Sequence, residues 1–227
     1  LERIRKLTLN NEEKEALLRT LVCSMDFRSH YTALHCSMMV RASEMLADYF
    51  DLDENVKNEI YIGSILHDLG KIAIPVEILE CPGKLDGRSW EIMKSHVMIT
   101  EDILKGCVSD AILQIAVRHH ETLDGSGYPR GIDATELNLP QCIVAASDIV
   151  SALSEERSYK QAFPLHEVMH ILRKMCDDGK ICPSVIQMLE DHCDDIYHAV
   201  LEEGLHTAEA FEQIYAEYYD LTQSKKE

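Results

Sequence analysis

The chain has 227 residues, of which 46% are hydrophobic and 27% charged, so it can bury a core and does not have the composition of a disordered protein. Its formal net charge of −18 argues against binding to polymeric nucleic acid or to an anionic membrane surface, because these partners are polyanions themselves. Any phosphate-bearing substrate therefore needs a local cluster of cations or metal ions.

Apolar residues recur at helical spacing along nearly the whole chain, and no stretch alternates regularly enough to indicate a strand. The sequence therefore predicts an all-α protein, a multi-helix bundle with two long functional loops at residues 70–87 and 121–138. The predicted helices span residues 11–25, 33–50, 54–68, 87–105, 110–120, 139–155, 164–178, 183–203 and 206–221.

Three segments are expected along this bundle. Residues 1–30 form an N-terminal helix that would end a linker from an upstream sensor or receiver domain. Residues 31–163 hold the distinctive motifs, and residues 164–227 form supporting helices of the same domain. The eight cysteines include no CxxC pair, and no signal peptide or membrane span is apparent, so we expect reduced thiols in a cytoplasmic protein without membrane contact.

A histidine and an aspartate stand side by side at His67 and Asp68, at the predicted end of a helix. Neighbouring side chains on a helix diverge by about 100°, so they fit around one shared cation better than they fit each other. Alone, such a pair is more often an ordinary surface pair. Its interpretation therefore depends on the other polar residues of the core.

Two of these residues lie on predicted buried helix faces. His35 shares its face with Met39 and Leu46, and Asp148 shares one with Ala145. A backbone carbonyl would satisfy His35 taken singly, but a buried carboxylate is costly unless it is paired or bound to a metal. Together with the neighbouring histidine and aspartate, these two residues favour a metal site.

Three more histidines would serve a second metal ion. His119 and His120 are neighbours, His96 lies about one helix upstream, and Asp68 could bridge the two ions. Two cations about 3.5–4 Å apart can hold a bridging hydroxide and clamp the phosphate that it attacks. Imidazole and carboxylate ligands suit iron, manganese, zinc or other first-row ions better than calcium.

Six motifs between Tyr31 and Lys160, in matching order and spacing, make the chain similar to the HD-GYP family, a branch of the HD phosphohydrolases that hydrolyses cyclic di-GMP. They are YTALH at 31–35, HDLGKIAIPVEIL at 67–79, PGKL at 82–85, WEIMKSH at 90–96, HHETLDGSGYP at 119–129 and ASDIVSALSEERSYK at 146–160. The resemblance implies a dinuclear centre with one metal held by His35, His67, Asp68 and Asp148, and the other by Asp68, His96, His119 and His120.

The resemblance also implies contacts to the substrate. Lys71 would place a cation near the nonbridging phosphate oxygens or assist proton transfer, unless it is only a charge at a helix end. Tyr128 would contact guanine or phosphate. Arg157 and Lys160 would bind the second phosphate and a guanine edge.

The second long loop, residues 121–138, contains the motif DGSGYP and is called the GYP loop. Gly125 and Gly127 would allow its backbone to turn sharply, and Pro129 would stiffen its exit. A purely architectural role for this loop stays open, because the metals and a nearby lysine could perform the chemistry without it.

The chain departs from the family pattern at four positions. Tyr31 stands where some members have a glutamate that binds a third metal, so we expect two divalent ions, iron or manganese foremost. Ser151 replaces a second aspartate, which would weaken support for a metal ligand. Leu34 and Ser158 replace a glycine and a proline.

The expected activity is hydrolysis of cyclic di-GMP to linear pGpG, GMP or both. A different class of function, a noncatalytic receptor for cyclic dinucleotides, stays open, as does an HD phosphohydrolase that acts on another nucleotide such as cyclic GMP-AMP. The sequence also leaves open a homodimer.

Overall fold

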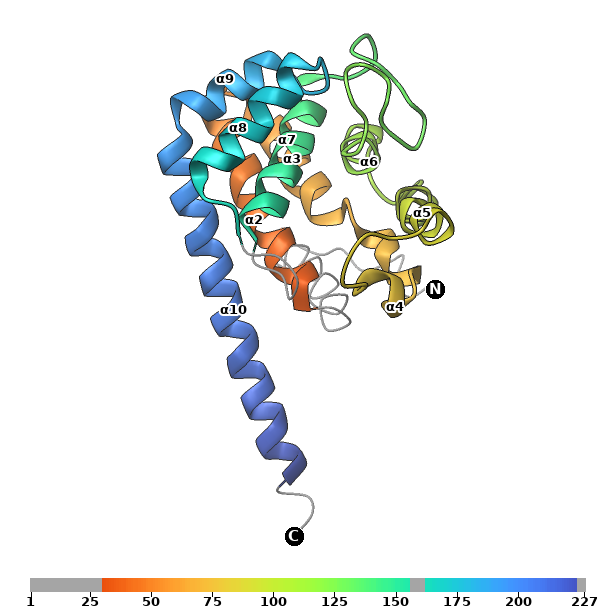
Figure 1. Cartoon of the computed structure of the whole chain (residues 1–227), viewed down its shortest axis with the longest axis vertical. Coiled ribbons are helices and arrows are strands. Elements are labelled where there is room, and N and C mark those ends of the chain that lie inside the picture. Colours follow the sequence, from red (N-terminus) through yellow and green to blue (C-terminus); the bar gives the residue numbers. More distant parts are fainter. Residues whose placement is uncertain (1–29, 156–161, 224–227) are drawn as a thin grey trace.

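The computed structural model describes residues 30–155 and 162–223, and within these ranges every regular element is a helix (Figure 1). The all-α prediction is confirmed. The predicted helix at 11–25, together with Arg157, Ser158 and Lys160, lies outside the described residues. The helices are α2 (His30–Tyr49), α3 (Glu54–Leu66), the 3-10 helix η2 (Leu69–Ala73), α4 (Val76–Leu79), α5 (Gly87–Leu104), α6 (Asp110–Val117), α7 (Leu139–Ser154), α8 (Leu165–Asp177), α9 (Pro183–Asp191) and α10 (Cys193–Gln223).

Side chains at four helix starts satisfy backbone N–H groups that have no partner inside the helix. Asp53 caps α3, Asp86 caps α5 and Ser109 caps α6. Asn138 caps α7 in a capping box with Gln141, whose side chain accepts a hydrogen bond from the Asn138 backbone N–H. These caps explain why the predicted starts of the four helices lie within one residue of the observed ones.

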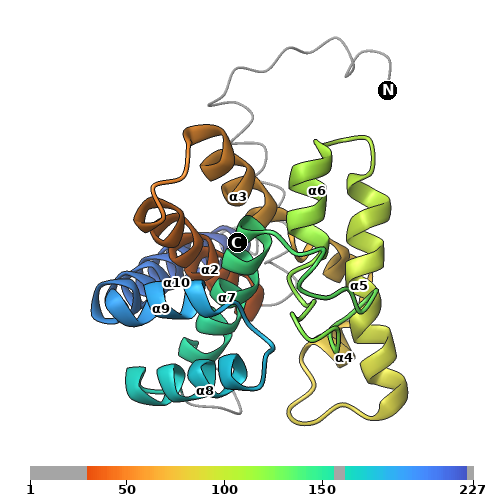
Figure 2. The same ribbon diagram turned by 90° about the horizontal axis from the view of Figure 1, so that it is seen from above.

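Two hydrophobic clusters hold the helices together. The larger cluster joins α2, α7, α8, α9 and α10, and the smaller one lies around α5 and α6. Helix α3 contributes Ile60 to the larger cluster and Leu66 to the smaller, while α6 contributes Ile115 and Val117 respectively. Figure 2 shows α5 and α6 side by side, across from α2 and α7. The candidate site lies where these two groups of helices meet.

The segment at residues 70–87 was predicted as a loop, but it contains η2 and α4. Gly70 explains the tight turn, because a Cβ atom at this position would lie 1.9 Å from the carbonyl oxygen of His96 on α5. The Gly70 N–H also donates a hydrogen bond to Thr100 Oγ1 at 2.8 Å. Close packing against α5 therefore sets the shape of this segment.

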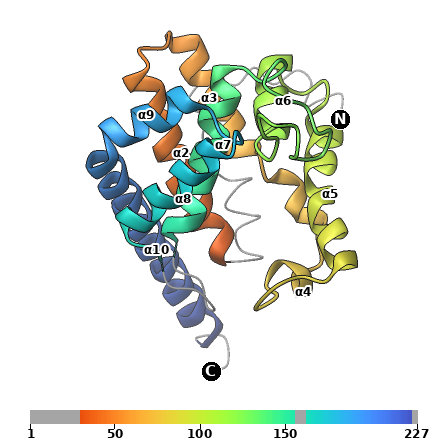
Figure 3. The same cartoon turned by 45° about the horizontal axis from the view of Figure 1, so that its top comes forward.

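The predicted helix boundary near residue 204 is wrong. The chain breaks instead at His192, and α10 continues through Gly204 to Gln223. A Cβ atom at Gly204 would lie 2.9 Å from Met38 Sδ, so this glycine permits the close approach of α10 to α2 and does not end a helix. Figure 3 shows α10 running past α2 and beyond the other helices.

The described helices include none with the length and apolar character needed to cross a membrane. The seven described cysteines are free thiols. Helices α8, α9 and α10 share a hydrophobic cluster with α2 and α7. The division of the chain at residues 30 and 163 stays a prediction.

Candidate metal centre

The structure brings all seven predicted metal ligands to one place at the junction of the two helix groups. All of them except His120, whose side chain is 26% exposed, are buried. The ligands come from α2 (His35), the turn between α3 and η2 (His67 and Asp68), α5 (His96), the segment directly after α6 (His119 and His120) and α7 (Asp148).

Asp68 lies at the centre of this arrangement. Its Oδ2 atom is 3.0 Å from His67 Nε2 and also contacts Lys71 Nζ. Its Oδ1 atom is 3.2 Å from His96 Nε2 and 4.0 Å from His119 Nε2. One carboxylate therefore faces two sets of imidazoles, which is the position that a bridging ligand requires.

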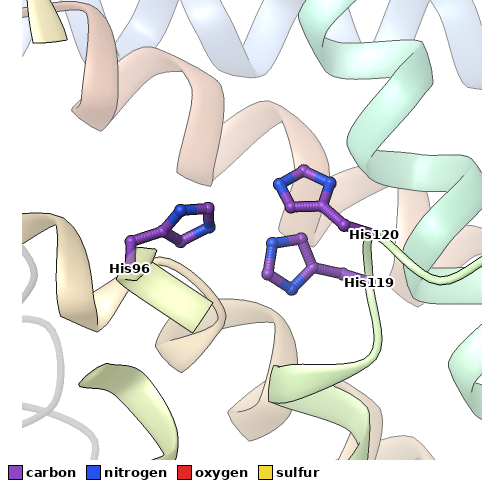
Figure 4. Close-up of side chains that lie close together, drawn as sticks. All are labelled: His96, His119 and His120. Atoms are coloured by element: carbon purple, nitrogen blue, oxygen red, sulfur yellow. The ribbon is translucent and has the colours of Figure 1, made fainter. Parts of the chain in front are cut away.

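The potential ligand atoms fall into two groups, one of which includes this carboxylate. In each group the atoms lie within 4.8 Å of one another. Figure 4 shows the second group, in which three imidazole rings from α5 and from the segment after α6 come together. The first group comprises His35, His67 and Asp68, and the second comprises His96, His119 and His120.

Asp148 on α7 makes a further link between the groups. Its Oδ1 atom is 2.9 Å from His35 Nε2, and its Oδ2 atom is 3.6 Å from His120 Nδ1. Helix α6 was expected to reach residue 120, but it ends at Val117. Consecutive helical side chains diverge by about 100°, so leaving the helix lets His120 face the same centre as the histidine before it.

Backbone carbonyls orient three of the rings. Each Nδ1 atom hydrogen-bonds the carbonyl oxygen three residues earlier, at 2.6 Å for His67, 2.7 Å for His96 and 2.7 Å for His119. The carbonyl can only accept, so Nδ1 carries the proton and Nε2 presents its lone pair to the centre. This is the tautomer that a metal ligand needs.

Four atoms of the centre are buried without a hydrogen-bond partner among the described residues: the Nε2 atoms of His67, His96 and His119, and Oδ1 of Asp68. Buried polar atoms are nearly always satisfied. Here the orphaned atoms converge, and their nitrogen and carboxylate donors suit first-row divalent ions. The residues therefore fit a metal centre.

The charge states of the centre agree with this fit. Burial lowers the pKa of His96, and burial together with the adjacent ring lowers the pKa of His119 well below its usual range. Burial likewise lowers the pKa of His120 to about 4. Burial alone would raise the pKa of Asp68 and of Asp148, but neighbouring cations and hydrogen bonds outweigh it and hold both carboxyls ionised.

Ser151 orients His35, which the sequence did not predict. The Ser151 hydroxyl lies 3.1 Å from His35 Nδ1 and donates a hydrogen bond to the carbonyl oxygen of Asp148 at 3.0 Å. Because the hydroxyl proton is used in that bond, the Ser151 oxygen accepts a hydrogen bond from Nδ1–H of His35. This contact directs Nε2 of the ring toward the centre. The serine thus supplies an orienting contact where loss of support was expected.

A buried carboxylate, Glu121, holds the GYP loop, a role that the sequence did not predict. Its two oxygens accept hydrogen bonds from the backbone N–H groups of Arg130 at 2.8 Å and Ile132 at 3.2 Å. The Arg130 guanidinium in turn binds both carboxylate oxygens of Glu101 on α5 at 2.7 and 2.6 Å. A glutamate directly after two histidines was the available signal.

The loop glycines behave differently from each other. Gly125 has φ 75°, which favours glycine. Gly127 instead permits close packing, because a Cβ atom there would lie 2.5 Å from the carbonyl oxygen of His120. Pro129 follows a cis peptide bond.

The predicted substrate contacts are only partly described. Lys71 lies in the centre through its contact with Asp68. The Tyr128 ring packs on the His120 ring with 4.6 Å between their centroids, so it borders the centre. Arg157 and Lys160 lie outside the described residues, and their roles stay predictions.

Comparisons with known proteins agree with this geometry. A family model described as an HD domain matches residues 13–185. The chain is 29% identical over 197 residues to the 3'3'-cGAMP-specific phosphodiesterase 1 of Vibrio cholerae serotype O1, covering 86% of this chain and 46% of that protein. It is 34% identical over 194 residues to a cyclic di-GMP phosphodiesterase of Thermotoga maritima, covering 82% and 52% respectively.

The chain thus spans about half the length of these curated relatives. Among solved structures, an HDG"Y"P protein from Bdellovibrio bacteriovorus superposes with a TM-score of 0.61 at 18% identity, covering 82% of this chain and 65% of that one. This likeness shows a shared fold.

Proposed function

Because the chain belongs to the HD domain family and carries the HD-GYP motifs, we propose that it is a metal-dependent phosphodiesterase that hydrolyses cyclic di-GMP. One observation supports this most strongly. The Asp68 carboxylate lies near His67 through Oδ2 and near His96 and His119 through Oδ1. The Nε2 atoms of these three rings are buried without a hydrogen-bond partner among the described residues. Two adjacent cation sites are what phosphodiester hydrolysis by two metals requires.

The proposed cofactors are two divalent ions, iron or manganese foremost. One would be held by His35, His67, Asp68 and Asp148, and the other by Asp68, His96, His119 and His120. When bound, such ions activate water as a nucleophile and offset the charge of the attacked phosphate. The protein contributes the spacing of the ligands and their burial, which makes electrostatic interactions stronger than in water.

Lys71 is the proposed cation for the phosphate. Its ammonium group contacts Asp68 and its side chain is 24% exposed, so it reaches from the centre toward the solvent side, where a substrate would enter. A fixed positive charge there would stabilise the negative charge that develops on the nonbridging oxygens. Tyr128, beside His120, would border the bound nucleotide.

A mixed cyclic dinucleotide is the second candidate substrate, because the chain is also similar to a phosphodiesterase specific for 3'3'-cGAMP. Both substrates present the same kind of phosphodiester linkage, and the metal ligands do not contact the bases in this proposal. The two are therefore separated by turnover measurements and not by the geometry of the centre.

The experiment is anaerobic turnover by protein loaded with Fe(II) or Mn(II), with cyclic di-GMP and 3'3'-cGAMP in parallel reactions. Chromatography would follow pGpG and GMP, or the corresponding mixed products. We expect cyclic di-GMP to be hydrolysed and the Asp68→Ala variant to be inactive. Faster hydrolysis of 3'3'-cGAMP would assign the second substrate. Binding without product, in protein that carries two metals, would contradict hydrolysis and favour a receptor.

A further inference from the structure

The GYP loop packs against one face of α5. Trp90, Lys94, Val97 and Glu101 follow one another at spacings of four, three and four, so they share this face. Glu101 binds Arg130, and Val97 belongs to the hydrophobic cluster against which Tyr128 packs. Figure 2 shows the loop lying beside α5. This face therefore connects α5 to the edge of the candidate metal centre.

Aromatic rings continue from the centre along this face to the surface. The ring centroids of His120 and Tyr128 are 4.6 Å apart, and those of Tyr128 and Trp90 are 6.0 Å apart, with the last two rings at 76°. Trp90, the outermost ring, is 45% exposed. A candidate metal ligand, a half-buried tyrosine and an exposed indole thus form one row.

Packing of the loop explains only the covered part of the indole. The edge-to-face contact with Tyr128 is favourable, and the exposed part of the indole leaves aromatic surface on which a base can stack. Lys94, the nearest cation on the same face, is already paired with Glu91 at 2.7 Å. The base of a nucleotide is neutral, so it can stack on an aromatic ring without a cation beside it, even in a chain of net charge −18.

We propose that Trp90 is a stacking platform for one purine base of the substrate, at the outer end of the row His120, Tyr128 and Trp90. The proposal rests on the proposed function, because it assumes that a cyclic dinucleotide occupies the metal centre. Stacking is tolerant of base identity, so Trp90 would raise affinity for guanine and adenine alike and would not select between them.

Trp90 is the chain's single tryptophan, which makes the proposal directly measurable. Stacking on guanine quenches indole fluorescence. In metal-loaded protein, we expect GMP and a hydrolysis-resistant phosphorothioate analogue of cyclic di-GMP to quench the emission. Ribose 5-phosphate, which offers a phosphate without a base, is expected to leave it unchanged. Calorimetry on the same samples would report binding independently of the indole.

Variants test the same point through kinetics. Trp90→Ala is expected to raise KM for cyclic di-GMP about tenfold or more with kcat nearly unchanged, and Trp90→Phe should restore most of the affinity. Met98 on the same helix is similarly exposed, at 42%, so Met98→Ala is the matched control and should behave as wild type. A merely structural role would instead lower the melting temperature and the metal content of Trp90→Ala.

Two results would overturn the proposal while leaving the proposed function intact. One is unchanged emission when calorimetry shows that the analogue binds. The other is a wild-type KM for Trp90→Ala. If wild-type protein with two metals neither binds nor hydrolyses a cyclic dinucleotide, the proposed function fails and the stacking platform fails with it.

Discussion

Two regions of the candidate metal centre orient their histidines by different means. In the region built by α3, α5 and α6, the rings of His67, His96 and His119 hydrogen-bond backbone carbonyl oxygens of these helices. In the region built by α2 and α7, the His35 ring depends on a side chain, the Ser151 hydroxyl at Nδ1. A backbone contact survives substitution of the residue that provides it, whereas a side-chain contact does not.

The centre therefore tolerates substitution at some of these positions better than at others. Substitution of Ser64, whose carbonyl orients His67, leaves the orienting contact in place, while substitution of Ser151 removes it. Asp68 is the ligand that the two proposed ion sites share, because its Oδ2 atom lies near His67 and its Oδ1 atom near His96. Its loss should therefore have the largest consequence.

We expect Asp68→Ala to reduce turnover of cyclic di-GMP to background, because the change removes the ligand that the two proposed ion sites share. The measurement is product formation by chromatography at saturating Mn(II). Asp102→Ala, at an exposed position of α5, is the control and should remain active. Substantial turnover by the Asp68 variant would contradict a shared carboxylate ligand between the two proposed ion sites.

Lys71→Met should lower kcat about 10²–10³-fold while metal content stays at the wild-type value, because the ammonium is proposed to act on phosphate and not on the ions. Steady-state kinetics and elemental analysis together measure this. Lys71→Arg keeps the charge and should retain part of the rate. Equal losses of bound metal and of activity in Lys71→Met would instead show that this residue supports metal binding.

Ser151→Ala should weaken metal binding about 10–100-fold, because His35 loses the group that orients its ring. Isothermal titration with Mn(II) measures the affinity. Ser64→Ala is a sharp control, since Ser64 is equally buried but orients His67 through its backbone carbonyl. Similar affinities for the two variants would remove the distinction between backbone-held and side-chain-held rings.

A smaller effect concerns pH. Burial lowers the pKa of His96, His119 and His120, so between pH 6.5 and about 4 the unfolded chain binds more protons, and the metal-free protein loses stability as pH falls. Burial also acts to lower the pKa of His67, but the charge of Asp68 raises it overall, so His67 alone opposes this trend. The lowered pKa values of Asp68 and Asp148 act in the same direction, mainly as the pH falls toward and below the usual value of 3.8.

Urea unfolding of metal-free protein, followed by circular dichroism, is therefore expected to have a lower midpoint at pH 5 than at pH 7. His119→Gln should reduce this difference, because it removes one of the buried rings whose protonation favours the unfolded chain. An equal or higher midpoint at pH 5 in the wild type would show that these rings are not held neutral.

The sequence predicted the helical fold and the convergence of the seven ligands, because motif order and buried helix faces carry that information. It did not predict η2, whose turn depends on the contact of Gly70 with α5, nor the continuous α10. A glycine can end a helix or permit close packing, and Gly204 does the second. Spacing along the chain does not separate these two uses.

The roles of Ser151 and Glu121 were hidden for a related reason. A serine within a helix and a glutamate at the start of a polar loop are typical of ordinary positions. Their importance arises when α2 meets α7 and when the GYP loop folds back over its own beginning. The Ser151 contact joins residues 116 positions apart, and the Glu121 contact depends on how the loop folds back across nine residues, so no local pattern specifies either.

The most direct test of the account is a stepwise titration of metal-free protein with Mn(II), with cyclic di-GMP turnover measured after each addition and bound metal counted by elemental analysis. If Asp68 joins two ion sites into one centre, activity should stay low over the first equivalent and reach its plateau at two ions per chain. A plateau at one ion per chain would contradict the dinuclear centre.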